Sequence, residues 1–191
     1  MKNIVFSHIA KAFDGKPVLQ DFSLTLPAGK RTCIMGPSGC GKTTLLNILT
    51  GLVQPDAGTV ENRPDRISMV FQENRLCEDF SALENVRMVA LNKTAQAKDL
   101  LCRMGLEEDM HKKVSTLSGG MKRRVAIARA LLYDAPLIVM DEPFKGLDEE
   151  TKDVVIQTVT AETEGKTVLF ITHDEAEAQH FADHVITMKP L

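Results

Sequence analysis

A glycine-rich segment of eight residues follows the spacing G-x-x-x-x-G-K-[ST], which is typical of loops that bind nucleotide phosphates. It consists of Gly36, Pro37, Ser38, Gly39, Cys40, Gly41, Lys42 and Thr43. Its glycines let backbone N–H groups turn toward phosphate oxygens, and a following helix adds its positive N-terminal end. Lys42 can reach the β- and γ-phosphates, and the Thr43 hydroxyl can ligate Mg²⁺. A glycine-rich turn could match by chance, but the strand before it and the helix after it favour ATP and Mg²⁺ as ligands.

A pair of carboxylates follows the most apolar stretch of the chain, residues 137–140. Because adjacent buried acids are costly without a cation or a shared proton, Asp141 and Glu142 indicate a site. Asp141 is placed to hold the magnesium shell, and Glu142 can face a water that attacks the γ-phosphate. An acidic junction between strand and loop is the plain alternative, and it is weak beside the phosphate loop.

A second glycine-rich helix start occurs at Ser118, Gly119 and Gly120. A capped helix N-terminus of this kind can hold an anion, although an ordinary capped helix has the same pattern. The basic run that follows, Lys122 to Arg124, is expected to be a solvated helix face. Cys40 lies inside the phosphate loop, and if its thiol is exposed, ATP should protect it from modification.

Hydrophobic patterning supplies the elements that must position these residues. Strands are expected at 4–13, 18–26, 31–35, 67–71, 137–140, 167–172 and 184–188, with a turn at 14–15. Helices are expected at 43–50 (stopped by Gly51), 81–91 (with a capping box at Ser81), 94–104, 118–133 and 148–163, with a further short helix before the last strand.

The alternation of apolar strands with helices predicts an α/β fold whose mostly parallel sheet is covered on both faces. An antiparallel β region should precede it. No strong strand occurs between residues 71 and 133, which indicates an inserted helical subdomain. We expect one domain over 1–191, with a nucleotide-binding core of 1–72 and 134–191 and a helical subdomain of 73–133.

The composition narrows the class of protein. A net charge of -3 does not suggest the positively charged surface that nucleic-acid-binding proteins need. A content of 43% hydrophobic residues is ordinary for a globular domain. The four cysteines form no CxxC pair, so neither zinc nor disulfides are expected. We expect neither a signal peptide at the N-terminus nor a membrane-spanning segment.

Residues 117–121, Leu-Ser-Gly-Gly-Met, resemble the LSGGQ signature of ATP-binding cassette (ABC) proteins, with Met121 in place of glutamine. Residues 122–130, Gln72, residues 146–148 and residues 172–174 are similar to the same family, in the same order over nearly the whole chain. The resemblance implies the P-loop NTPase core fold. It also implies a head-to-tail dimer, in which each signature faces the ATP bound to the other subunit.

Roles for further residues follow only from that resemblance. His173 would contact the γ-phosphate, Gln72 would reach Mg²⁺ or the lytic water, and Phe13 would stack on adenine. ATP contacts are also implied for Val18 and Thr44, contacts across the dimer for Ser118, Gly119 and Gly120, and a place in the dimer-interface loop for Asp148. Lys145 and Gly146 depart from the small residues usual beside that loop.

The family resemblance also implies partners. We expect a cytoplasmic ATPase held at the inner face of the cell membrane by transmembrane permease subunits, with a second nucleotide-binding domain and an extracytoplasmic substrate-binding protein in the complex. Residues 71–76 resemble bacterial importers of the nitrate, sulfonate and taurine group. A soluble ABC ATPase of the chromosome type is the alternative, but no sustained heptad tract occurs. A regulatory module without turnover is disfavoured by Asp141 and Glu142.

Overall fold

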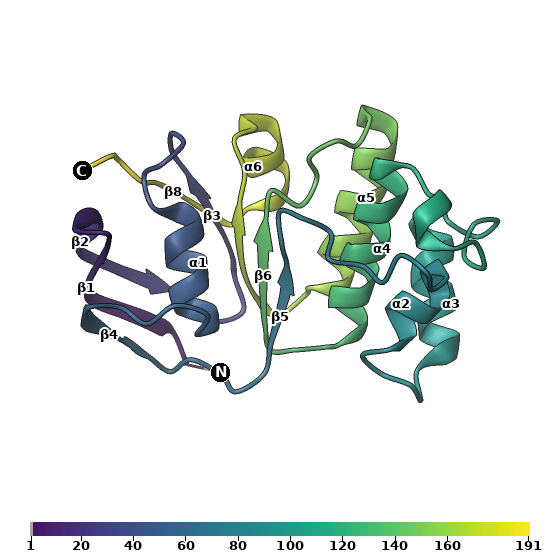
Figure 1. Cartoon of the computed structure of the whole chain (residues 1–191), viewed down its shortest axis with the longest axis horizontal. Coiled ribbons are helices and arrows are strands. Elements are labelled where there is room, and N and C mark those ends of the chain that lie inside the picture. Colours follow the sequence, from purple (N-terminus) through teal and green to yellow (C-terminus); the bar gives the residue numbers. More distant parts are fainter. Residues whose placement is uncertain (1) are drawn as a thin grey trace.

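The computed structural model describes residues 2–191, and its centre is a five-stranded parallel sheet (Figure 1). The strands are ordered β5 (Ile67–Val70), β6 (Leu137–Asp141), β7 (Thr167–Ile171), β3 (Arg31–Met35) and β8 (His184–Thr187). Every residue of β6 and β7 is buried, as expected for strands covered on both faces. The predicted α/β fold with a mostly parallel sheet is confirmed.

A three-stranded antiparallel sheet packs beside this core, in the order β2 (Lys16–Leu26), β1 (Ile4–Phe13) and β4 (Ala57–Glu61). The turn between β1 and β2 lies at Asp14 and Gly15, as predicted. Strand β4 was not predicted, because its sequence, Ala-Gly-Thr-Val-Glu, has little apolar alternation. Its pairing with β1 supplies the stabilisation that its own side chains do not.

The two faces of the parallel sheet bury different helices, because side chains alternate along each strand. Leu137 and Val139 of β6 face a cluster formed with α1 (Lys42–Thr50) and the antiparallel sheet. Ile138 and Met140 face the other cluster, which includes side chains of α4 (Gly119–Leu132) and α5 (Glu149–Glu162). A short helix, α6 (Glu175–Phe181), precedes β8.

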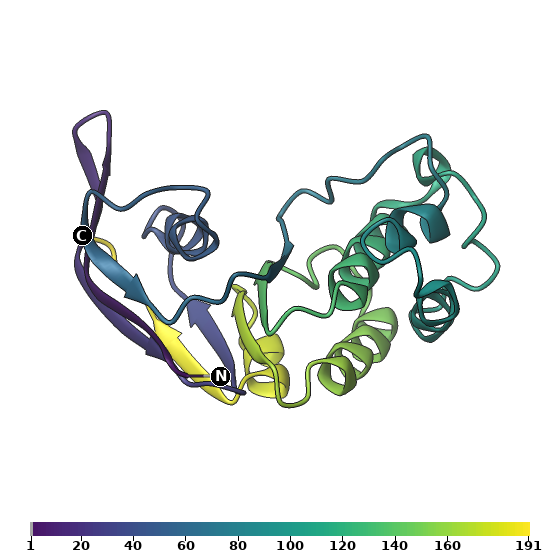
Figure 2. The ribbon, with the colours of Figure 1, turned by 90° about the horizontal axis from the view of Figure 1, so that it is seen from below.

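The remaining helices lie at the end of the molecule away from the antiparallel sheet (Figure 2). They are α2 (Ala82–Arg87), α3 (Thr94–Arg103) and the 3-10 helix η1 (Val114–Thr116). The capping box at Ser81 is present, but α2 ends at Arg87 rather than near Leu91. Leu91 is 68% exposed, so no buried contact extends the helix that far. The division into core and helical subdomain stays a prediction.

Within residues 2–191, no helix combines the length and the apolar composition needed to cross a bilayer.

Candidate functional site

The phosphate-type loop connects the C-terminal end of β3 to the start of α1. Gly36 has φ +147°, and a Cβ built there would lie 2.4 Å from the Met188 carbonyl oxygen. Gly41 caps α1 with a left-handed φ of 97°. The loop therefore needs glycine at both positions, for close approach at one and for conformation at the other.

The Lys42 side chain lies inside this loop. Its Nζ donates to the carbonyl oxygens of Gly36 (2.7 Å) and Pro37 (2.8 Å), and the residue is buried. The Cys40 Sγ lies 3.9 Å from the same ammonium. The idea of an exposed Cys40 thiol is wrong, because Cys40 is only 4% exposed and packs with Leu45 and Leu19 in the α1 cluster.

Asp141 ends β6 directly beside the phosphate-type loop. The Thr43 hydroxyl donates a hydrogen bond to Asp141 Oδ2 at 3.1 Å, so a hydroxyl oxygen and a carboxylate oxygen lie side by side. Burial raises the pKa of Asp141 above its ordinary value, and the Thr43 hydrogen bond opposes that shift. Two oxygen donors fit Mg²⁺, which in phosphate sites takes its other ligands from water and phosphate oxygens. Within residues 2–191, His, Cys, Asp and Glu form no group of three that could hold a metal alone.

The Glu142 carboxylate is held from two sides. His173 Nε2 lies 3.0 Å from Oε1, and Lys145 Nζ lies 2.5 Å from Oε2. The Glu142 amide donates to the Ile171 carbonyl at 2.9 Å, which ties it to the end of β7. Its φ of 48° is unusual for a residue other than glycine, and such strain is most often found where a site demands it.

These side chains line one cavity of about 220 Å³ at the C-terminal ends of the parallel strands. Its lining is Ser38, Gly39, Gly41, Lys42, Thr43, Thr44, Gln72, Asp141, Glu142, Ile171 and His173. The cavity thus brings together the phosphate-type loop, both carboxylates and two residues that were predicted only from the family resemblance, Gln72 and His173.

Other predicted residues lie outside this cavity. Phe13 is 43% exposed at the hairpin end of β1, with Lys11 Nζ 5.4 Å from its ring centroid. Val18 lies on β2, with its carbonyl oxygen against Gly41. Gly36, Pro37 and Cys40 belong to the loop but not to the cavity lining.

The signature residues and Asp148 also lie apart from the cavity. Ser118 caps α4 by accepting a hydrogen bond from the Met121 amide at 3.2 Å. Gly119 and Gly120 form the first turn of that helix. Asp148 caps α5 by accepting from the Thr151 amide at 2.9 Å. All of these residues therefore lie at helix N-termini, and none of them lines the cavity of its own chain.

The expectation that residues 122–124 form a solvated face is wrong for Arg123. Its side chain is 4% exposed and bonded to backbone carbonyl oxygens near the cavity. Burial lowers the pKa of Arg123 to about 10, which leaves it charged at neutral pH. The available signal was helical spacing, because Arg123 stands one and two turns before the buried residues Ile127 and Leu131. Lys145 was also missed as a Glu142 partner.

Comparisons with known proteins identify the family of this chain. A family model described as ABC transporter matches residues 19–145. The taurine import ATP-binding protein TauB of Yersinia pestis is 38% identical, over 93% of this chain and 76% of the relative. The bicarbonate transport ATP-binding protein CmpD of Synechocystis is 40% identical, over 90% and 67%. A dimeric structure of the ATP-binding cassette MJ0796 bound to ADP and Pi superposes with a TM-score of 0.88, at 32% identity over 97% of this chain and 94% of that chain.

Proposed function

This chain belongs to the ABC transporter family of ATP-binding subunits and is an ATPase of that family, and from this premise we propose that Glu142 is its hydrolytic carboxylate. The observation that carries the proposal is the single cavity shared by Glu142, His173, Lys42 and Asp141. The reaction is in-line attack of water on the γ-phosphate of ATP, for which positioning and charge stabilisation are the main catalytic terms.

Each residue has one task in this scheme. Lys42 places its ammonium on the β- and γ-phosphates, in the loop whose carbonyls it contacts in this structure. Glu142 orients the attacking water and accepts its proton. His173, whose Nε2 lies 3.0 Å from Glu142 Oε1, orients that carboxylate and contacts the γ-phosphate. Thr43, Asp141 and Gln72 would hold Mg²⁺, and the ion when bound supplies positive charge to the phosphate oxygens.

The cavity is half of a composite site. Ser118, Gly119 and Gly120 form a helix N-terminus suited to a γ-phosphate but do not line the cavity of their own chain. A second copy arranged head to tail would supply them, with Asp148 in the loop at the interface. The solved MJ0796 cassette is dimeric, which supports this arrangement for a chain 32% identical to it. Phe13, on β1, would stack on adenine, and Val18 and Thr44 would complete the nucleotide contacts.

ATP hydrolysis by this chain drives transport through permease subunits, which hold the chain at the inner face of the cell membrane. An extracytoplasmic substrate-binding protein delivers the substrate to them. Relatives named for taurine import, bicarbonate transport and spermidine/putrescine import are 38%, 40% and 35% identical, so transporters of chemically different substrates share this subunit type. We therefore propose an importer and name no substrate.

Two measurements test this proposal. If the site is composite, ATPase rate per mole of purified chain should rise with chain concentration, and it should stay constant if each chain hydrolyses alone. A tagged chain purified from membranes of its native cell should bring integral membrane subunits with it. Recovery of the chain without such subunits, after mild solubilisation that keeps a control complex intact, would contradict the transport role.

A further inference from the structure

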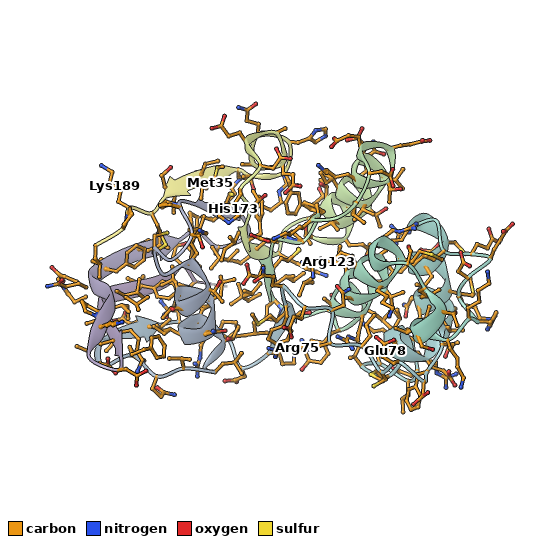
Figure 3. The ribbon with its side chains drawn as sticks, turned by 45° about the horizontal axis from the view of Figure 1, so that its top comes forward. Met35, Arg75, Glu78, Arg123, His173 and Lys189 are labelled. Carbon is orange, nitrogen blue, oxygen red and sulfur yellow. The ribbon has the colours of Figure 1, made fainter. Side chains whose placement is uncertain are left out.

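The Arg123 guanidinium joins two of the loops that carry residues of the cavity, the one with Gln72 and the one with Glu142. We propose that Arg123 is a positioning residue for ATP hydrolysis, which fixes the backbone of Glu142 relative to that of Gln72. The inference rests on the proposed role of Glu142. Figure 3 shows Arg123 between α4 and the end of the sheet, and not at the outer surface of the helix.

On the side of the carboxylates, Arg123 donates to three successive carbonyl oxygens. Nη2 lies 2.6 Å from the oxygen of Asp141 and 2.6 Å from that of Glu142. Nε lies 2.8 Å from the oxygen of Pro143. The guanidinium therefore holds the two peptide units that flank Glu142 Cα and the next peptide unit toward the C-terminus.

On the other side, the same guanidinium holds the loop after β5. Nη1 lies 2.5 Å from the Phe71 carbonyl oxygen, 3.4 Å from that of Gln72 and 3.3 Å from Asn74 Oδ1. Arginine has five N–H donors in a fixed planar fork, and here they serve acceptors from two separate loops. Lysine has three donors on one atom and cannot reach both loops in this geometry.

Core packing alone does not account for a cation at this position. Arg123 is 4% exposed, and among the described residues its guanidinium bonds to carbonyl and amide oxygens rather than to a carboxylate. Removing a charge from water is costly, and the six oxygens that accept hydrogen bonds from Arg123 offset that cost here, whereas packing by itself would not require a charge. The buried charge instead orients Glu142, whose φ of 48° is strained. Arg123 bonds to the Glu142 carbonyl oxygen, and the Glu142 amide bonds to the Ile171 carbonyl oxygen.

The same helix carries a matched control. Arg124 is half-buried, and its Nη1 donates to the carbonyl oxygens of Met104 (2.7 Å) and Gly105 (3.1 Å), away from the cavity. Arg123→Lys and Arg124→Lys thus make the same chemical change in neighbouring residues that both bind carbonyls. Only the first touches the loops of Gln72 and Glu142.

The test compares kcat and the Kd for a fluorescent ATP analogue, with activity expressed per nucleotide-binding site so that unfolded protein is not counted. For Arg123→Lys we expect kcat to fall on the order of a hundredfold, as when a reacting group is misplaced by about 1 Å, with Kd near the wild-type value. Arg124→Lys should keep kcat close to wild type. If the lysine variant folds poorly, Arg123→Gln gives the same comparison without the charge.

A double-mutant cycle separates positioning from general stability. Because Arg123 acts through Glu142, Arg123→Lys should reduce single-turnover hydrolysis little further in a Glu142→Gln background. Unchanged kcat in Arg123→Lys, equal losses in both lysine variants, or additive losses in the cycle would each overturn the inference. Lack of hydrolysis by the wild-type chain would instead contradict the proposed function.

Discussion

Gly36 has no room for a side chain, and this makes Gly36→Ala a sharp test of the loop geometry. The added Cβ would lie 2.4 Å from the Met188 carbonyl oxygen, and the Met188 amide is itself bonded to the Met35 carbonyl at 2.8 Å. Neither backbone segment can move away without breaking the β3–β8 edge of the sheet. The clash should cost about 1–3 kcal/mol, as for overpacked cores.

Backbone strain adds to that cost. At φ +147° an alanine costs on the order of 1–3 kcal/mol more than glycine. We therefore expect Gly36→Ala to lower the free energy of unfolding by about 4 kcal/mol, since both costs apply. For a chain of this length the melting temperature should fall by roughly 10 °C. Differential scanning calorimetry without nucleotide measures it directly.

Gly39→Ala is the matched control in the same loop. Gly39 also has a positive φ, of 82°, but a Cβ built there meets nothing within 4 Å. Strain alone should cost about 1–2 kcal/mol, so the melting temperature should fall by only a few degrees. Equal melting temperatures for the two variants would contradict the close approach between Gly36 and the Met188 carbonyl oxygen, and with it the predicted clash.

Three further predictions concern single side chains in or beside the cavity. Lys42→Ala should weaken binding of a fluorescent ATP analogue by roughly ten- to a hundredfold, the usual loss for a hydrogen bond to a charged group, and an unchanged Kd would contradict its role. Burial raises the pKa of Asp141 above its ordinary 3.8, so this carboxyl favours folding while protonated and loses that contribution as pH rises through the raised pKa. Asp141→Asn should therefore have a higher free energy of unfolding than wild type at neutral pH, and the difference should disappear in acid. Urea titrations at several pH values measure that difference. The same variant should lose Mg²⁺-dependent hydrolysis. Cys40 should react with a thiol reagent far more slowly than the exposed Cys77, with or without ATP, and rapid labelling of Cys40 in the folded chain would show that the loop opens.

Local signals in the sequence account for much of the site. The phosphate-type loop was predicted because its glycine spacing is dictated by backbone geometry, and Gly36 and Gly41 adopt the positive φ values that it requires. Asp141 and Glu142 were predicted because two acids directly after a buried strand are costly without a function. Gln72 and His173 were identified only through the family resemblance, since neither has a local pattern of its own.

The remaining features depend on tertiary neighbours. Strand β4 exists because β1 offers it an edge, and nothing in its own five residues requires an extended structure. Arg123 was assigned to solvent from its charge, whereas the carbonyl oxygens that stabilise it come from loops more than fifteen residues away in sequence. Lys145 reaches Glu142 only because the chain turns at the left-handed Glu142.

Substitution of the hydrolytic carboxylate tests the central claim most directly. Glu142→Gln keeps the size of the side chain and removes the group that accepts the proton from water. Steady-state ATPase should fall on the order of 10²–10⁴-fold, the usual contribution of general base catalysis. Affinity for the ATP analogue should stay near the wild-type value, and gel filtration with Mg²⁺-ATP should show an accumulated dimer. Unchanged ATPase activity in this variant would contradict the account.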